Sequence, residues 1–192
     1  MKLSYCTRFS LIIILVLFIT FPTNAKNPPS PPFSKGGMEG FERFRVTEVH
    51  DGDTISIRTR SFAGVPLKIE RVRLIGIDAP ELKQEPWGRL SKRYLKKLIS
   101  ESDWVVSIEF DVEQRDKYGR LLSYVWDKKG RLINETMIEN GYAMLYTIPP
   151  NVKYAEKFTA AQKKAHARQI GIWGKKGLRK SPEQWRMEHP RQ

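Results

Sequence analysis

Residues 71–81 read R-V-R-L-I-G-I-D-A-P-E, and this stretch predicts a β-strand that ends in a cluster of charged side chains. Residues 71–76 alternate between two faces, which is the period of a strand. Pro80 ends any strand pairing because it has no N–H to donate. Asp78 and Glu81 are therefore expected at the exit of the strand, on a backbone that Pro80 stiffens.

Three side chains of this stretch are of the types that phosphate chemistry uses. The guanidinium of Arg73 is a planar fork of donors that fits a phosphate. Asp78 is a hard oxygen ligand of the kind that Ca²⁺ or Mg²⁺ takes, and Glu81 is a candidate general base. Taken alone, the stretch is equally compatible with a charged strand edge followed by a solvated turn.

Two earlier strands flank a turn that holds two aspartates. Residues 44–49 and 55–58 alternate, and H-D-G-D-T at residues 50–54 lies between them. Asp-Gly is a hairpin signal, so Asp53 is either a second turn former or a carboxylate that faces a neighbouring strand end. With a third strand over residues 67–77, Asp53 and Asp78 would lie close together. Such a pair is unfavourable unless a cation neutralises it.

The rest of the chain supplies two more strands and three helices. The apolar patterns predict helices over residues 89–100, 132–140 and 154–168, and strands over residues 104–110 and 121–126. Five strands with one helix between the third and the fourth are typical of an OB-type barrel. The expected fold class is therefore α+β, mostly β: a five-stranded OB-fold barrel with about three helices.

A third polar stretch, D-K-Y-G-R at residues 116–120, precedes the fifth strand. Arg120 is a second candidate fork for a phosphate. Lys117 and Tyr118 line the same loop, where the tyrosine can stack on a base or hydrogen-bond a phosphate. The alternative is a polar hairpin with an incidental arginine. Tyr146, further along, is either a core aromatic or a base-stacking residue.

Residues 1–25 have the layout of a secretory signal. A basic start is followed by an almost unbroken apolar run over residues 11–21, and Thr23-Asn24-Ala25 is a suitable cleavage site. The run is short for a full membrane span, and an uncleaved anchor is the alternative. We expect cleavage near Ala25, a secreted or periplasmic protein, and no stable membrane association of the mature chain. The only cysteine, Cys6, would be lost with the signal, so no disulfide or Cys-based zinc site is expected.

Composition divides the remainder into three parts. Residues 26–40 are rich in Pro, Gly and Ser and predict a linker. Residues 41–174 hold the folded domain, and residues 175–192 form a basic tail without a clear period, in which Trp185 is placed to pack back onto the domain. The net charge of +13 favours a polyanionic partner: nucleic acid, anionic lipid or acidic polysaccharide. Nothing in the sequence demands an oligomer, and a monomer is expected.

The three polar stretches together resemble the thermonuclease, or staphylococcal nuclease-like, family. They are D-G-D-T (51–54), R-L-I-G-I-D-A-P-E (73–81) and D-K-Y-G-R (116–120), and the resemblance extends over about residues 41–173. Any one motif is weak, whereas all three in this order, with a helix between the second and the third, are specific. The resemblance implies a secreted, Ca²⁺-dependent nuclease of DNA and RNA that hydrolyses phosphodiester bonds and leaves 3′-phosphate ends.

The resemblance also implies a role for each matching residue. Asp53, Asp78 and the backbone carbonyl of Ala79 would bind Ca²⁺, Glu81 would activate the attacking water, and Arg73 and Arg120 would contact the scissile phosphate. Lys117, Tyr118 and Tyr146 would bind the substrate. Ala79 stands where the best-known family member has threonine. Alanine keeps the backbone carbonyl but lacks the hydroxyl that helps to position water.

The competing hypothesis is a non-catalytic OB-fold module that binds nucleic acid. The complete set of Asp53, Arg73, Asp78, Glu81 and Arg120 speaks against it, because a module that only binds has no reason to keep acids beside a phosphate. A third hypothesis, a membrane-tethered surface protein, differs only in the fate of residues 1–25.

Overall fold

The computed structural model describes residues 42–59 and 67–190 of the chain. The expected signal sequence, residues 1–25, and the expected linker, residues 26–40, lie outside these ranges. No helix within the described ranges has both the length and the apolar character that crossing a bilayer requires.

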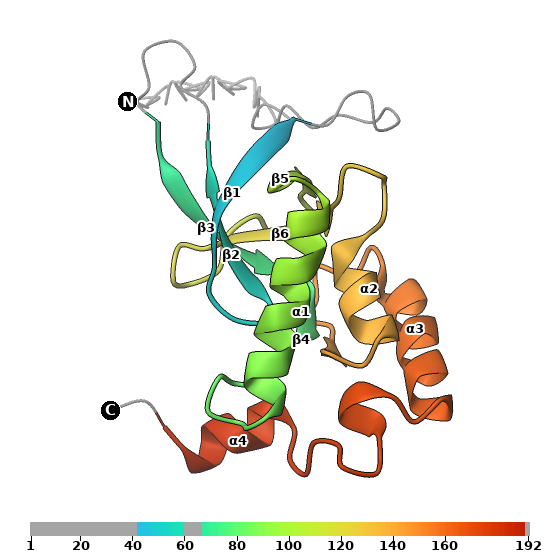
Figure 1. Ribbon diagram of the computed structural model, residues 1–192. Coiled ribbons are helices and arrows are strands. Elements are labelled where there is room, and N and C mark those ends of the chain that lie inside the picture. Colours follow the sequence, from blue (N-terminus) through green and yellow to red (C-terminus); the bar gives the residue numbers. More distant parts are fainter. Residues whose placement is uncertain (1–41, 60–66, 191–192) are drawn as a thin grey trace, which may run out of the picture. The chain divides into compact units, whose positions relative to one another are not determined.

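Five strands close into a barrel in the order β1-β2-β3-β6-β5, and β5 pairs again with β1 (Figure 1). They are β1 (Arg43–Val49), β2 (Thr54–Arg58), β3 (Ile69–Leu74), β5 (Val105–Glu109) and β6 (Leu121–Trp126). β3 and β6 run parallel, and the other neighbouring pairs are antiparallel. The predicted five-stranded, OB-type barrel is confirmed, including the helix between its third and fourth strands.

The prediction of one continuous strand over residues 67–77 is wrong. β3 ends at Leu74, and β4 (Gly76–Asp78) pairs with β7 (Met144–Tyr146) in a separate two-stranded sheet. The break falls at Gly76, whose φ of +78° suits glycine. A Cβ at this position would lie 2.5 Å from the ring of Phe158. Because the chain changes sheets here, Asp78 leaves the barrel wall.

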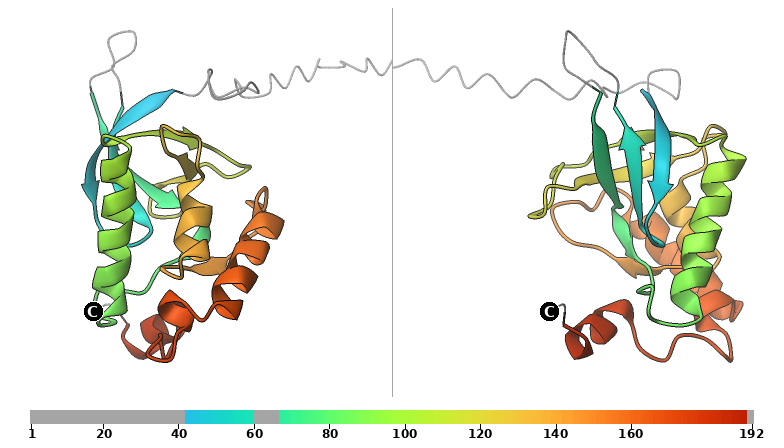
Figure 2. Two further views of the ribbon diagram at one scale, coloured as in Figure 1. Left: turned by 45° about the vertical axis from the view of Figure 1, so that its right-hand side comes forward. Right: turned by 60° about the vertical axis from the view of Figure 1, so that its left-hand side comes forward.

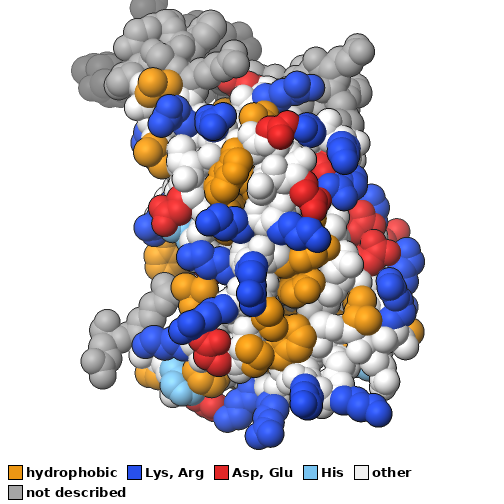
Figure 3. All heavy atoms as spheres, in the orientation of Figure 1, with side chains coloured by type: hydrophobic (Ala, Val, Ile, Leu, Met, Phe, Trp, Pro, Cys, Tyr) orange, Lys and Arg blue, Asp and Glu red, His pale blue; other side chains and the backbone are white. Residues whose placement is uncertain are grey.

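Three helices match the predicted ones to within a few residues. They are α1 (Trp87–Glu101), α2 (Ile133–Glu139) and α3 (Ala155–Ala167), followed by the short 3-10 helix η2 (Gly171–Trp173). α1 buries an apolar stripe that includes Leu95, Leu98 and Ile99. α2 and α3 pack side by side (Figure 2). Lys and Arg side chains gather on the face of the molecule that carries α1 (Figure 3).

The expected basic tail contains a fourth helix, α4 (Pro182–Glu188). It begins with a capping box, in which Ser181 Oγ accepts the N–H of Gln184 at 3.1 Å and Gln184 Oε1 accepts the N–H of Ser181 at 3.0 Å. The letters S-P-E-Q carry this signal, with Ser at the N-cap, Pro at the first helical position and Gln at the third. The absence of an apolar period had concealed it.

A buried asparagine joins α2 to the barrel. Asn134 is fully buried; its Oδ1 accepts the N–H of Val125 in β6 at 2.9 Å, and its Nδ2 donates to the carbonyl of Ile75 at 2.8 Å. Ile75 is the residue between β3 and β4. The side-chain amide therefore pairs a backbone group that the strand break would otherwise leave without a partner.

Asn134→Ala is expected to lower the free energy of unfolding by about 2–4 kcal/mol, because it leaves a buried N–H and a buried C=O unpaired. Urea unfolding followed by circular dichroism measures this loss. The matched control is Asn140→Ala, which removes one bond to the Thr136 carbonyl at the partly exposed end of the same helix and should cost about 1 kcal/mol or less. Equal losses in the two variants would contradict the role of Asn134.

Candidate active site

The turn between β1 and β2 gives its two aspartates different roles. Asp51 Oδ1 accepts the backbone N–H of Asp53 at 2.9 Å and so forms the turn. The carboxylate of Asp53 reaches elsewhere: its Oδ2 accepts the N–H of Ala79, 26 residues further on, at 2.8 Å, and its Oδ1 accepts the hydroxyl of Thr54 at 3.0 Å. Asp53 is therefore not a second turn former.

Arg73 bridges two carboxylates that are far apart in the sequence. Its Nη1 lies 3.2 Å from Asp53 Oδ2, and its Nη2 lies 3.3 Å from Asp78 Oδ1. Nη1 also donates to the carbonyl of Leu74 at 3.0 Å, which holds the fork against its own strand. The side chains of Asp53 and Asp78 are only 10% and 5% exposed. The structure thus brings together the two aspartates in the way the strand-end pattern predicts.

The electrostatics of this pair favour a further cation. Burial raises the pKa of Asp53 to about 6, and the positive charge of Arg73 offsets only part of that rise. One guanidinium shared by two buried carboxylates leaves the cluster negative. Burying unpaired charge is costly, so this part of the molecule attracts additional positive charge.

Glu81 lies in a tight turn that Gln84 holds. The N–H of Glu81 donates to Gln84 Oε1 at 2.9 Å, and the N–H of Gln84 donates to the Glu81 carbonyl at 2.8 Å. The side chain of Glu81 is 31% exposed, whereas that of neighbouring Asp78 is 5% exposed. Water can therefore reach the carboxylate of Glu81, as it must for a group that activates water.

Arg186 of α4 is the residue that sequence reasoning missed. Its Nη1 donates to Asp78 Oδ1 and to Glu81 Oε1, both at 3.0 Å, and its Nη2 donates to Asp78 Oδ2 at 2.8 Å. The hydrogen bonds that Arg186 donates to Asp78 raise the pKa of Arg186 above its already high value. The S-P-E-Q capping box could have revealed the helix. No local signal points to carboxylates 108 and 105 residues earlier in the chain.

The loop before β6 holds a separate cluster of basic side chains around Asp116. Asp116 Oδ1 accepts the N–H groups of Tyr118 and Arg120 at 2.9 and 3.0 Å, and its Oδ2 pairs with Arg120 Nε at 2.7 Å. Burial opposes ionisation of Asp116, but the hydrogen bonds from Arg120 hold its pKa below the usual range. Tyr118 is 71% exposed, with Lys117 Nζ and the Arg120 guanidinium 5.2 and 5.7 Å from its ring centre.

Strand register relates the outlying candidates to the carboxylates. Leu122 pairs with Arg73 across β6 and β3, and Arg120 lies directly before β6, two residues from Leu122. Met144 pairs with Asp78 across β7 and β4, so Tyr146, two residues later, shares the face of Met144. Within residues 42–59 and 67–190, no hydrogen bond or ion pair joins Arg120 or Tyr146 to Asp53 or Asp78.

A copy of the D-K-Y-G-R turn lies at the other end of β6, where residues 127–131 read D-K-K-G-R. Asp127 Oδ1 accepts the N–H groups of Lys129 and Arg131 at 2.8 Å each, and its Oδ2 pairs with Arg131 Nε at 2.6 Å. Arg131 also pairs with Glu101 at the end of α1. The two turns share their internal chemistry and differ in what surrounds them.

The described part of the chain contains no group of three or more His, Cys, Asp or Glu side chains arranged to hold a metal ion. Asp53 and Asp78 offer two carboxylates.

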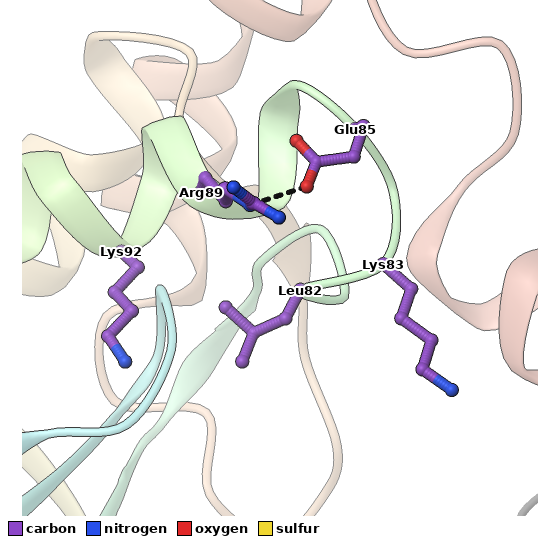
Figure 4. A pocket seen from close by; sticks show the side chains of 5 residues that line it. All are labelled: Leu82, Lys83, Glu85, Arg89 and Lys92. Carbon is purple, nitrogen blue, oxygen red and sulfur yellow. Dashed lines mark ion pairs between the residues drawn. The ribbon is translucent and has the colours of Figure 1, made fainter.

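Beside the Glu81 turn, an open pocket is lined by Leu82, Lys83, Glu85, Arg89 and Lys92 (Figure 4). Arg89 engages Glu85 at 2.5 Å in this pocket. Lys83 and Lys92 leave the pocket with a positive charge, which suits an anionic ligand.

Known proteins resemble this chain over the same region. The family model described as Staphylococcal nuclease homologue matches residues 71–175. The chain is 37% identical over 137 residues to the thermonuclease of Staphylococcus intermedius, and this match covers 69% of this chain and 76% of that protein. It is 32% identical over 137 residues to the thermonuclease of Staphylococcus hyicus, with the same coverage. It is 34% identical over 134 residues to endonuclease YncB of Bacillus subtilis, covering 66% of this chain and 59% of that protein.

The match begins at β3 and ends just past η2, so it includes the strand break, the Glu81 turn and the Asp116–Arg120 loop. The barrel, the order of its motifs and these similarities agree. The chain therefore belongs to the staphylococcal nuclease family.

Proposed function

We propose that this chain is a secreted, Ca²⁺-dependent nuclease that hydrolyses phosphodiester bonds of DNA and RNA and leaves 3′-phosphate ends. Membership of a nuclease family, with relatives named thermonuclease and endonuclease, supports hydrolytic cleavage of nucleic acid. The observation that carries the proposal is the buried pair Asp53 and Asp78 beside the partly exposed carboxylate of Glu81. These acids would repel nucleic acid in a protein that only bound it.

The donor set fits a hard cation. Asp53 and Asp78 offer carboxylate oxygens, and the backbone carbonyl of Ala79 lies on the residue whose N–H binds Asp53. Oxygen donors suit Ca²⁺ and do not favour Zn²⁺. Ca²⁺ held by these residues would supply positive charge where the phosphate becomes more negative in the transition state.

The other side chains have distinct roles in the proposed reaction. Glu81 accepts a proton from the attacking water. Arg73 and Arg120 donate to the phosphate oxygens, because a guanidinium fork matches their geometry. Lys117, Tyr118 and Tyr146 bind the nucleotide, with the exposed ring of Tyr118 available to a base or a phosphate.

Location and assembly belong to the same proposal. Residues 1–25 would be removed near Ala25, and the mature chain would act as a monomer, in the medium or the periplasm, without stable membrane association. Retention of the apolar run would instead leave the protein tethered to a membrane.

Glu81→Gln is expected to lower the rate of DNA cleavage by about a hundredfold or more, because the variant keeps the shape but loses the base. Release of acid-soluble nucleotides from single-stranded DNA, with Ca²⁺ and with chelator, measures it. Glu113→Gln changes an exposed acid in another loop and should leave cleavage unchanged. If the folded wild-type protein binds DNA and never cuts it with Ca²⁺, the non-catalytic module is the correct description.

Arg120→Lys is expected to reduce kcat/KM by about a hundredfold, since lysine keeps the charge but loses the planar fork. The twin turn provides a matched control: Arg131→Lys removes the equivalent guanidinium from D-K-K-G-R and should leave kcat/KM within about twofold of the wild type. Similar losses in both variants would show that the effect comes from turn stability.

Asp53→Asn is expected to raise the free energy of unfolding in chelator at pH 7 by about 1–3 kcal/mol. The pKa of Asp53 is about 6 in the folded chain, above the ordinary aspartate value of 3.8. The part of the wild-type free energy of unfolding that is linked to Asp53 is therefore lost as pH rises from about 4 to about 6, whereas asparagine does not titrate. The gain of the variant should vanish near pH 4.

The same variant should lose its response to metal. Ca²⁺ that binds only the folded protein raises the Tm by mass action, and we expect this rise in the wild type and not in Asp53→Asn. Asp103→Asn, at an exposed carboxyl between α1 and β5, is the control that should keep it. If Asp53→Asn is less stable than the wild type in chelator at pH 7, the pairing of Asp53 with Arg73 outweighs the cost of burying its charge.

A further inference from the structure

The C-terminal segment is tied to the loop that carries Glu81. Trp87 Nε1 donates to the carbonyl of Lys176 at 3.1 Å, and the buried Gln84 donates through Nε2 to the carbonyl of Lys180 at 3.1 Å. Pro182, at the start of α4, is buried. Figures 1 and 2 show α4 close to the loop that leads into α1. These contacts lie along the segment before Arg186 and deliver its side chain to the carboxylates.

Arg186 uses the same oxygens that the proposed Ca²⁺ site and the proposed base depend on. Its two terminal nitrogens take both oxygens of Asp78 and one oxygen of Glu81, at 2.8–3.0 Å. The side chain of Asp78 is 5% exposed, and that of Arg186 is 36% exposed. Because the guanidinium binds both oxygens of this buried carboxylate, few of the oxygen lone pairs of Asp78 remain available to coordinate a second cation.

We propose that Arg186 is a built-in competitor of Ca²⁺: it pairs with Asp78 and Glu81 in the metal-free protein, and Ca²⁺ binding displaces it together with α4. The inference rests on the proposed Ca²⁺ site. The cluster of Asp53, Arg73 and Asp78 is negative by itself, and Arg186 neutralises it when no metal is bound. Two cations in the same place repel each other, so the two states exclude one another.

The consequence for affinity follows from population arithmetic. A ligand that binds only the open state has an apparent affinity reduced by the fraction of molecules that are open. The docked helix therefore raises the Ca²⁺ concentration at which the site fills. By reciprocity, Ca²⁺ weakens the docking of α4 by the same factor. Such a device keeps the site closed where Ca²⁺ is scarce.

Calorimetric titration of the purified, metal-stripped protein with CaCl₂ tests the proposal. Arg186→Gln is expected to bind Ca²⁺ about 10- to 100-fold more tightly than the wild type, because charge-assisted pairs no longer compete. Arg179→Gln removes the same charge from an exposed position of the same segment and should bind as the wild type does. Ser181→Ala breaks the capping box at a distance from the carboxylates and should tighten binding about two- to tenfold.

Hydrogen exchange gives a readout that does not depend on cleavage. The amide of Trp185 donates to Ser181, and that of His189 donates to Trp185. In the wild type, Ca²⁺ should speed the exchange of both amides at least about fivefold. In Arg186→Gln they should exchange fast even without metal.

The outcomes separate this inference from the proposed function. Wild-type protein and Arg186→Gln that bind Ca²⁺ equally tightly would overturn the competitor role and leave the Ca²⁺ site standing. If Arg186→Gln keeps the Ca²⁺ affinity of the wild type but has a lower kcat/KM, the competitor role is also overturned, because Arg186 would then contribute to substrate binding or turnover. Failure of both proteins to bind Ca²⁺ or to cut DNA would overturn the proposed function and the inference together.

Discussion

Two buried carboxylates, those of Asp53 and Asp78, meet at the single guanidinium of Arg73. Burying charge is costly unless it is paired, so the surrounding backbone has to hold all three groups in place. The β1–β2 turn aims Asp53 at Ala79. The break at Gly76 turns the chain out of the barrel before Asp78. Asn134 satisfies the backbone at that break, and the local fold is thereby organised around the charge cluster.

The cluster holds buried negative charge at the expense of stability. Burial raises the pKa of Asp53 to about 6, which means that the folded chain tolerates its negative charge less well than water does. Functional sites commonly carry such perturbed groups. Arg186 supplies from within the chain the positive charge that a bound metal ion would otherwise supply. Whether a side chain or a metal ion fills the place is then a question of concentration and relative affinity.

The twin turns at the two ends of β6 separate local from tertiary information. D-K-Y-G-R and D-K-K-G-R fold alike, with an aspartate that accepts two backbone N–H groups and pairs with the arginine four residues on. Arg120 directly precedes β6, whose Leu122 pairs with Arg73 in the neighbouring strand, whereas Arg131 pairs with Glu101 at the end of α1. The motif therefore specifies a turn, and only its position beside β3 makes it a candidate for phosphate binding.

The sequence by itself determined the barrel strands, the three main helices and the meeting of Asp53 with Asp78. Strand and helix periods are local, and three successive antiparallel strands bring the start of β2 beside the end of β3. Only the tertiary structure decided the strand break at Gly76, where Phe158 packs too closely to allow any side chain, and the buried role of Asn134. It also decided the partners of Arg186. Those carboxylates lie more than a hundred residues away, and only the docking of the C-terminal segment against Gln84 and Trp87 brings them within reach.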